Sequence, residues 1–240
     1  MEFSIKAGSP EKHRTGCVVV GVFDGRKLSA SAEQLDGAAR GYLSDVLKTG
    51  DLEGALGRTL LLHKVPSLAA DRVLLVGLGR ERDFHEGPYR TAVSAAVKAL
   101  KATGATEATF TLPEIALKKR DIGWKVEHAV IALMEGAYRF DRLKSKKADA
   151  GKALKKVTLT VPRKNDVTEG DTAVQRAVAI AEGMNLAKDL GNLPGNYCTP
   201  TYLADQAVEL GKRHGIKVEV FDLKGIEKLG MGSFLAVAQG

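Results

Sequence analysis

The stretch Cys17–Phe23, CVVVGVF, decides the fold. It is short, apolar and rich in valine, which is typical of a strand buried on both faces of a parallel sheet. Further strands are predicted at Thr59–Val65, Arg72–Gly77, Thr106–Leu112 and Leu154–Val161. Segments with helical spacing lie between them. This order predicts an α/β domain with a parallel sheet and helices on both faces.

The helices of this domain are predicted from apolar spacing and from proline and glycine. Apolar residues recur every four positions within Leu28–Leu47, which fits one helix face. Pro88 would open a second helix at the position that proline tolerates best, and Gly104 would end it. Val126–Met134 is a third helical segment. Together these elements predict one complete domain over residues 1–163.

A polar, turn-rich segment, Pro162–Asp171, marks the end of this domain. A long helix is predicted next, with Thr168 or Asp171 as its cap and Gly191 at its end. We therefore expect residues 164–192 to form a linker and a connecting helix.

The remaining segment, residues 193–240, contains too few elements for a domain of its own. Thr199–Pro200 supplies a cap and a proline at the first helical position, and Gly215 ends that helix. Strands are expected at Lys217–Phe221 and Phe234–Ala238. Parallel strands are normally covered on both faces within sheets of several strands. We expect the beginning of a second α/β domain that is cut off.

The composition excludes several classes of protein. The chain has 240 residues, of which 44% are apolar and 27% are charged, as in globular proteins. No apolar run approaches the ~20 residues of a membrane span, and no signal peptide is visible. Cys17 and Cys198 are too few for a disulfide framework or a four-cysteine metal site. These features favour the cytoplasm and no membrane partner.

The positive net charge of +7 is concentrated in residues 118–164, which hold 14 Lys and Arg against 5 Asp and Glu. Such a segment would suit a polyanion such as nucleic acid. The commoner meaning is a solvated helix face and a linker. No aromatic residue alternates with the basic ones as a base-stacking platform requires. The candidate polyanion patch comprises Lys118, Lys119, Arg120, Lys144, Lys146 and Lys147.

The short motifs of the chain each have an ordinary structural interpretation. Val76–Gly79 (VGLG) follows a strand, but a dinucleotide fingerprint needs a third glycine where Arg82 stands and a later acidic residue. It is therefore a tight strand exit or a looser phosphate-binding loop. Cys198 precedes a helix, where a packing role is the commoner one. Lys188 and Asp189 would be a solvated pair at a helix end, and the five histidines share no ligand spacing.

Four stretches together resemble the leucyl aminopeptidase (cytosol aminopeptidase) family of metallo-exopeptidases. The most specific is Asn185–Pro200, NLAKDLGNLPGNYCTP, similar to the start of the family's catalytic domain. Leu229–Gly240, LGMGSFLAVAQG, resembles the strand leading toward the family's metal site. Glu135–Lys147, EGAYRFDRLKSKK, resembles the family's helix before the inter-domain link, and Arg72–Phe84, RVLLVGLGRERDF, resembles its N-terminal domain.

This resemblance implies a fold and an activity. The family has an N-terminal α/β domain similar to a macro domain, a long helix, and a larger α/β domain that carries catalysis. Its members are cytosolic homohexamers that remove N-terminal amino acids, leucine favoured. Two divalent ions, zinc or manganese, bind the substrate's amino group and activate a bridging water. By the same resemblance, we expect the N-terminal domain to assist assembly.

The resemblance assigns no catalytic or metal-binding residue to this chain. The family's metal-binding lysine, aspartates and glutamate, and its Asn-Thr-Asp-Ala-Glu-Gly-Arg-Leu motif, lie beyond the last residue present here. Acidic residues such as Asp189, Asp205 and Asp222 are scattered on helix ends and surfaces. We therefore expect residues 1–240 alone to bind no metal and to be inactive. The alternatives are a macro-like module that binds ADP-ribose or phosphate, and a nucleic-acid-contacting platform.

Overall fold

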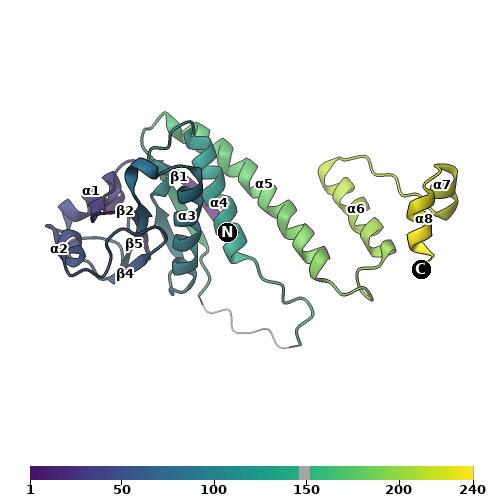
Figure 1. Cartoon of the computed structure of the whole chain (residues 1–240), viewed down its shortest axis with the longest axis horizontal. Coiled ribbons are helices and arrows are strands. Elements are labelled where there is room, and N and C mark those ends of the chain that lie inside the picture. The colour runs from purple at the N-terminus through teal and green to yellow at the C-terminus, as the bar shows by residue number, and fades with distance from the viewer. Residues whose placement is uncertain (146–151, 240) are drawn as a thin grey trace. The chain divides into compact units, whose positions relative to one another are not determined.

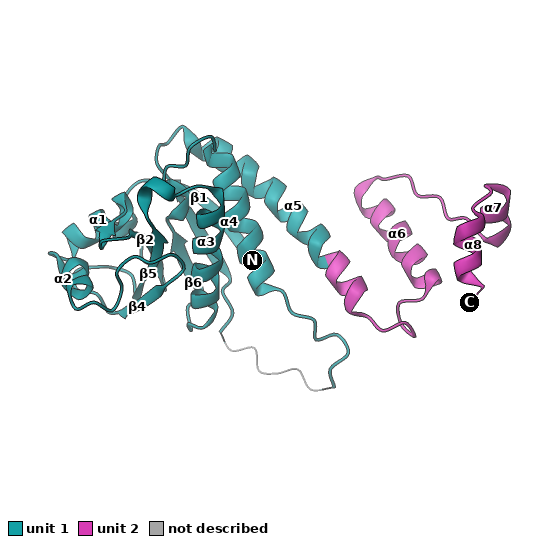
Figure 2. Ribbon diagram, in the orientation of Figure 1, with its two compact units in different colours: residues 1–185 teal, residues 186–240 magenta. Residues whose placement is uncertain are grey.

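The structure is a computed structural model that describes residues 1–145 and 152–239. The chain divides into two compact units, Met1–Asn185 and Leu186–Gly240 (Figure 2). Within the described ranges, all strands belong to the first unit, and the regular structure of the second unit is helical. No helix among the described residues is long and apolar enough to cross a membrane.

One mixed sheet organises the first unit (Figure 1). Its seven strands are β1 (Glu2–Ala7), β2 (Val18–Phe23), β3 (Lys27–Leu28), β4 (Thr59–His63), β5 (Arg72–Gly79), β6 (Glu107–Phe110) and β7 (Lys156–Val161). They lie in the order β1-β7-β6-β2-β5-β4, and β3 pairs with β2. The pairs from β1 to β5 along this order are parallel, whereas β4 is antiparallel to β5 and β3 to β2.

The central strand β2 is buried on both faces, as predicted. Val19 packs into the core on one side of the sheet. Val18, Val20 and Val22 pack into the core on the other side. Successive side chains of a strand point to opposite faces, so two packed faces require an unbroken apolar run rather than an alternating one.

Helices cover both faces of this sheet (Figure 1). The helices that begin in the first unit are α1 (Ala30–Ala38), α2 (Tyr42–Lys48), α3 (Glu86–Lys101), α4 (Ile122–Ala137) and α5 (Asp166–Asn192). Buried residues of α1 and α2 join the core that contains Val18. Those of α3, α4 and the first half of α5 join the core that contains Val19. The predicted α/β architecture is therefore confirmed for the first unit.

The prediction of one helix face over Leu28–Leu47 was wrong, because two helices occupy this stretch. Arg40 and Gly41 adopt left-handed backbone conformations, with φ of 56° and 85°, which ends one helix and starts the next. The Asp36 carboxylate accepts the backbone N–H of Leu43 at 2.8 Å and thereby caps α2. A regular four-residue spacing does not reveal such a break.

Two helix starts also differ from the predicted positions. The helix α3 begins two residues before Pro88, because the His85 ring accepts the Gly87 N–H at 3.3 Å and caps it there. It ends at Lys101, before Gly104. The helix α5 begins at Asp166, ahead of the Thr168 and Asp171 proposed as caps.

The edge strand β1 was not predicted. Only Ile5 of its six residues is buried, so its sequence lacks a clear apolar pattern. It is held by parallel pairing with β7 along its whole length. The hydroxyls of Ser4 and Thr158 also lie 3.0 Å apart. This pairing joins residues more than 150 positions apart, which local sequence does not indicate.

The second unit contains the end of α5 and three helices, α6 (Pro200–His214), α7 (Leu223–Lys228) and α8 (Gly232–Ala238). The predicted ends of α6 are confirmed. The Thr199 hydroxyl accepts the Tyr202 N–H at 3.2 Å, and Pro200 is the first helical residue. Gly215 ends the helix with a φ of 69°.

The two strands predicted in this unit were wrong. Residues 217–221 form no strand, and Phe234–Ala238 lies in α8. A strand needs a neighbour to pair its backbone groups, and the described part of this unit offers none. A helix satisfies the same groups locally, as in the bond from the Leu235 N–H to the Met231 carbonyl at 3.1 Å. Phe234 and Val237 remain 58% and 83% exposed.

Candidate functional site

A cavity of about 730 Å³ lies at the carboxyl end of the parallel strands in the first unit. Phe23 is the last residue of β2, Phe84 follows β5, and Ile115 follows β6; all three line the cavity. Leu28 and Leu117 complete its apolar walls. The rings of Phe23 and Phe84 meet edge to face, with centroids 5.5 Å apart. The walls therefore form an apolar surface that exists before any ligand binds.

The strand order explains why a cavity forms here. The strand β2 lies between β5 and β6. From β2, the chain leads to β5 on one side of β2. From β5, it leads through α3 to β6 on the other side of β2. Connections that depart in opposite directions leave a crevice beyond the carboxyl ends of the strands, which is where open α/β sheets bind ligands.

The Glu114 carboxyl group is the most unusual polar group of this cavity. It ends the short 3-10 helix Leu112–Glu114 that follows β6, and it lines the cavity. The Ser31 hydroxyl, only 2% exposed, donates a hydrogen bond to Glu114 Oε2. Burial raises the pKa of Glu114 above its ordinary value, and the Ser31 hydrogen bond and nearby Lys125 offset only part of this rise. The carboxyl group keeps acceptor capacity beyond the single Ser31 hydrogen bond.

Thr160 of β7 also lies near the Glu114 carboxyl, close enough to lower its pKa. Its hydroxyl is completely buried, yet it has no hydrogen-bond partner of acceptable geometry among the described residues. A hydrogen bond weakens steeply when it is misaligned, so this hydroxyl makes no effective bond to the carboxyl group. Thr160 therefore adds polarity next to Glu114 rather than occupying its acceptors.

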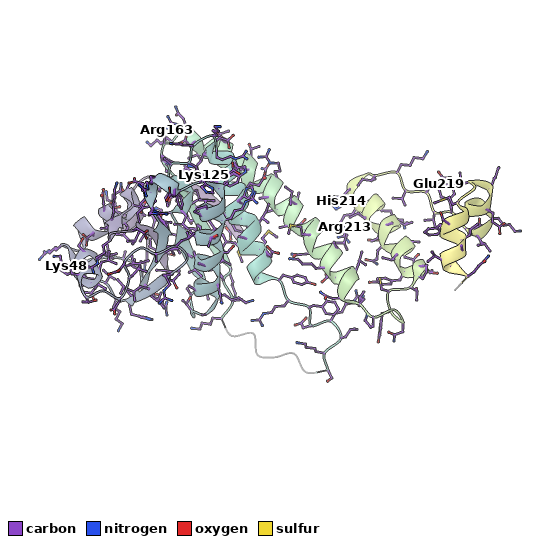
Figure 3. All side chains as sticks on the ribbon, in the orientation of Figure 1. Lys48, Lys125, Arg163, Arg213, His214 and Glu219 are labelled. Carbon is purple, nitrogen blue, oxygen red and sulfur yellow. The ribbon has the colours of Figure 1, made fainter. Side chains whose placement is uncertain are left out.

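Lys125, labelled in Figure 3, carries a buried ammonium group that interacts electrostatically with the Glu114 carboxyl group. It projects from α4, is 5% exposed, and donates to the Ile115 carbonyl at 2.9 Å. Burial lowers the pKa of Lys125, whereas the carboxylates of Asp166, Asp121, Glu114 and Glu169 raise it. Lys125 thus interacts with several acids, and Glu114 is only one of them.

Charged side chains surround the cavity mouth, and most of its basic ones already have acidic partners. Lys27 Nζ lies 2.5 Å from Glu81 Oε2. Arg82 Nε lies 3.8 Å from Asp83 Oδ1. Both pairs are exposed, so each contributes little stability. The lining as a whole contains three Lys or Arg residues and four acidic residues, with His85 in addition.

The four described residues of the candidate polyanion patch lie on either side of α4 in the chain. Lys118, Lys119 and Arg120 are exposed and lie just before α4. Lys144 lies after α4, whose 16 residues span about 24 Å. Lys146 and Lys147 are outside the described residues. Nucleic-acid binding by this segment stays a prediction.

One residue of this group takes part in an aromatic cluster that the sequence did not reveal. The Arg120 guanidinium lies 5.1 Å from the Trp124 ring centroid and 2.6 Å from Glu86 Oε1. Arg90 lies 5.5 Å from the same ring, and His128 stacks on it with centroids 3.9 Å apart. The ring is thus contacted by two guanidinium groups and an imidazole, and it is not a free platform for a base.

The segment Val76–Gly79 is a packed strand end, and it is not a phosphate-binding loop. The Gly77 N–H donates to the Arg58 carbonyl at 2.7 Å, and the Gly79 N–H donates to the Gly54 carbonyl at 2.8 Å. A phosphate-binding loop needs free backbone N–H groups that point at the anion. The N–H groups of Gly77 and Gly79 are therefore not available to ADP-ribose or phosphate, and binding through neighbouring loops stays a prediction.

The remaining candidate residues lie on helices, next to a helix or in the core. Cys198 is partly buried and lies just before α6, and Lys188 and Asp189 lie on α5. Cys17 is completely buried, and burial raises the pKa of its thiol to about 12. Within residues 1–145 and 152–239, no three His, Cys, Asp or Glu side chains gather in a way that could hold a metal ion.

Sequence reasoning missed Ser31, Glu114 and Lys125 as candidate site residues. The sequence offered one indication for Glu114, because this residue follows a predicted parallel strand and ligand-binding residues gather at the carboxyl ends of such strands. Ser31 and Lys125 belong to other elements, 83 and 10 positions from their partners Glu114 and Ile115. Only the fold brings these groups together.

Comparison with known sequences gives concordant results for both units. The N-terminal domain model of the cytosol aminopeptidase family matches residues 19–147, and the catalytic domain model of that family matches residues 185–240. Two relatives described as probable cytosol aminopeptidases are 51% identical (Chromobacterium violaceum) and 53% identical (Methylobacillus flagellatus) over 240 residues. These alignments include all of this chain but only 46% and 48% of the relatives. The chain thus spans about half their length.

Solved structures agree on the fold. A mutant of tomato leucine aminopeptidase is similar with a TM-score of 0.78 at 20% identity, over 99% of this chain and 48% of that one. The bottromycin maturation enzyme BotP, in complex with Mn, has a TM-score of 0.67 at 22% identity, over 90% of this chain and 40% of that one. Because one family accounts for both the first unit and the segment from residue 185 onward, the chain belongs to the cytosol aminopeptidase family.

Proposed function

We propose that the chain is the N-terminal part of a leucyl aminopeptidase that releases N-terminal amino acids, leucine favoured, from peptides with two divalent metal ions, manganese or zinc. The match of residues 185–240 to the family's catalytic domain carries this proposal, because it accounts for a segment that a binding module would leave without a role. The extent of the relatives, about twice this chain, supports it.

The exposed apolar residues of the second unit support the same proposal. Phe221, Leu223, Leu229, Phe234 and Val237 are each 46% or more exposed. Large apolar side chains are normally buried, because burial stabilises a protein by about 25 cal/mol per Å² of apolar surface. We expect further strands and helices of a catalytic domain to cover them in the whole protein.

The described residues do not fit a two-metal centre. No group of three or more potential ligands occurs among them, whereas hard divalent ions need several converging oxygen or nitrogen atoms. We therefore assign no metal ligand and no catalytic residue within this chain. In this proposal, the metal-binding and catalytic groups belong to the rest of the catalytic domain.

The decisive experiment compares the 240-residue chain with the full gene product, each assayed on leucine p-nitroanilide with Mn²⁺ or Zn²⁺ added. We expect the full product to hydrolyse the substrate and the 240-residue chain to be inactive. An inactive full product, tested with both metals and several aminoacyl amides, would refute the aminopeptidase assignment. Activity in a preparation of the 240-residue chain free of longer protein would refute the placement of the catalytic groups.

The proposal extends to domain organisation and assembly. We propose an N-terminal domain over residues 1–163, a linker and connecting helix over 164–192, and the beginning of the catalytic domain over 193–240. The whole protein would be a cytoplasmic homohexamer whose N-terminal domain assists assembly. Deletion of residues 1–160 from the full product, followed by light scattering, tests this role; an unchanged hexamer would contradict it.

A further inference from the structure

We propose that the cavity at the carboxyl end of β2, β5 and β6 binds a small organic cation, a protonated amine on an apolar or aromatic body, with the Glu114 carboxylate as the acceptor of the amine. This site lies entirely within the first unit and does not depend on peptidase activity. None of its groups is needed for the aminopeptidase assignment above.

The apolar walls favour a ligand with an apolar or aromatic body. Phe23, Phe84 and Leu117 are at most 9% exposed, and they line the cavity together with Leu28 and Ile115. About 730 Å³ is within the range of small-molecule sites and is ample for one substituted ring. An apolar or aromatic group gains most in such a place, because it leaves water for a surface that is already formed.

The charged residues of the lining favour a ligand with a positive charge. The Glu114 carboxylate receives one hydroxyl hydrogen bond, from Ser31, and a carboxylate has room for several. Lys27 and Arg82 at the mouth already have acidic partners, and acidic residues outnumber Lys and Arg in the lining. Outside these ion pairs, the lining holds two carboxylates and the single ammonium of Lys118, so a phosphate or carboxylate would meet more repulsion than attraction. An ammonium group would meet a partly desolvated carboxylate, where a charge-assisted hydrogen bond is strongest.

The buried Lys125 does not remove this preference. Its ammonium donates to the Ile115 carbonyl, and the carboxylates of Asp166, Asp121 and Glu169 act on it together with Glu114. The hydrogen bond of Lys125 thus goes to a carbonyl and not to Glu114, so the Glu114 carboxylate keeps acceptor positions for a second cation.

The test uses the 240-residue chain and three probes with the same aromatic body. Titration with 2-phenylethylamine, 2-phenylethanol and phenylacetate, monitored by NMR, separates cationic, neutral and anionic ligands. We expect the amine to shift resonances of residues 23–31 and 114–117, the alcohol to bind more weakly, and phenylacetate not to bind. ADP-ribose serves as a fourth probe and should not bind either.

The variant Glu114→Gln keeps the shape of the side chain and removes its charge. It should weaken amine binding about 10- to 100-fold, as expected for the loss of a hydrogen bond to a charged group. Glu107→Gln, at the opposite end of β6, is the matched control and should bind like the unmodified chain. If Glu114→Gln does not fold, Ile115→Trp tests the site by filling the cavity, and it should abolish binding while Glu114 remains.

Three results would each overturn the proposal. The first is no binding of the amine at millimolar concentration to the folded chain. The second is binding of phenylacetate or ADP-ribose as tight as that of the amine. The third is unchanged amine affinity in a folded Glu114→Gln or Ile115→Trp variant.

Discussion

The close approach of Gly77 to the segment before β4 allows a prediction with a definite magnitude. A Cβ atom at position 77 would lie 2.0 Å from the Ala55 carbonyl oxygen and 3.0 Å from the Gly54 carbonyl carbon. Both obstacles are backbone atoms, so no side chain can rotate away. The segment would have to move by about 1 Å or more to restore a tolerable contact.

Such a movement acts on three backbone hydrogen bonds. They join the Gly77 N–H to the Arg58 carbonyl at 2.7 Å, the Gly57 N–H to the Gly77 carbonyl at 2.9 Å, and the Gly79 N–H to the Gly54 carbonyl at 2.8 Å. A typical net contribution is about 1 kcal/mol for each. The substitution Gly77→Ala should therefore lower the free energy of unfolding by about 2 to 4 kcal/mol, a large share of the total for a domain.

Urea unfolding monitored by tryptophan fluorescence measures this loss in the first unit. Trp124 is the only tryptophan of the chain and lies on α4, so its emission reports on this unit without interference from the second. Gly183→Ala is the matched control, because that glycine lies on α5 with no neighbour within 4 Å. The control should be neutral or stabilising by about 0.5 to 1 kcal/mol, since alanine favours a helix.

An unchanged urea midpoint for Gly77→Ala would refute the packing argument. It would also favour the alternative interpretation of Val76–Gly79 as a looser phosphate-binding loop. A lowered midpoint with an unchanged slope would support packing, because the slope reports on the surface exposed on unfolding.

Three further predictions concern single groups. Cys17 should resist iodoacetamide at pH 8 in the folded chain, because burial raises the pKa of its thiol to about 12. The partly buried Cys198 should react under the same conditions. Peptide mass spectrometry distinguishes the two thiols, and equal labelling before denaturation would contradict this prediction. Thr199→Ala should destabilise α6 by about 1 kcal/mol through loss of its cap, detected as faster hydrogen exchange in α6 but not in the separately capped α7. Arg120→Gln should raise the pKa of Glu86, because the hydrogen bond from Arg120 lowers it in the folded chain. The stability that this pair contributes is present above the pKa that Glu86 has in the unfolded chain. It is lost as the pH falls through the lower pKa of Glu86 in the folded chain, so the variant should lose this pH dependence. A carboxyl NMR titration that the substitution leaves unchanged would exclude the interaction.

The sequence by itself determined the class of the first unit and the ends of several elements. The valine run of β2 has one stable environment, between two packed layers, and this alone indicates a sheet covered on both faces. Thr199, Pro200 and Gly215 were sufficient to place α6, because caps act on backbone groups within a few residues. The family resemblance carried by Asn185–Pro200 likewise depends only on local sequence.

Tertiary structure decided what depends on distant partners. The strand β1 exists because β7 pairs with it, and Phe234–Ala238 is helical because the described part of its unit offers no strand to pair with. The cavity arises from strand order, and the pKa of Glu114 is raised by burial, which Ser31, Thr160 and Lys125 of three other elements only partly offset. Helix caps and apolar runs act over a few residues, whereas pairing and burial depend on groups that only folding brings into contact.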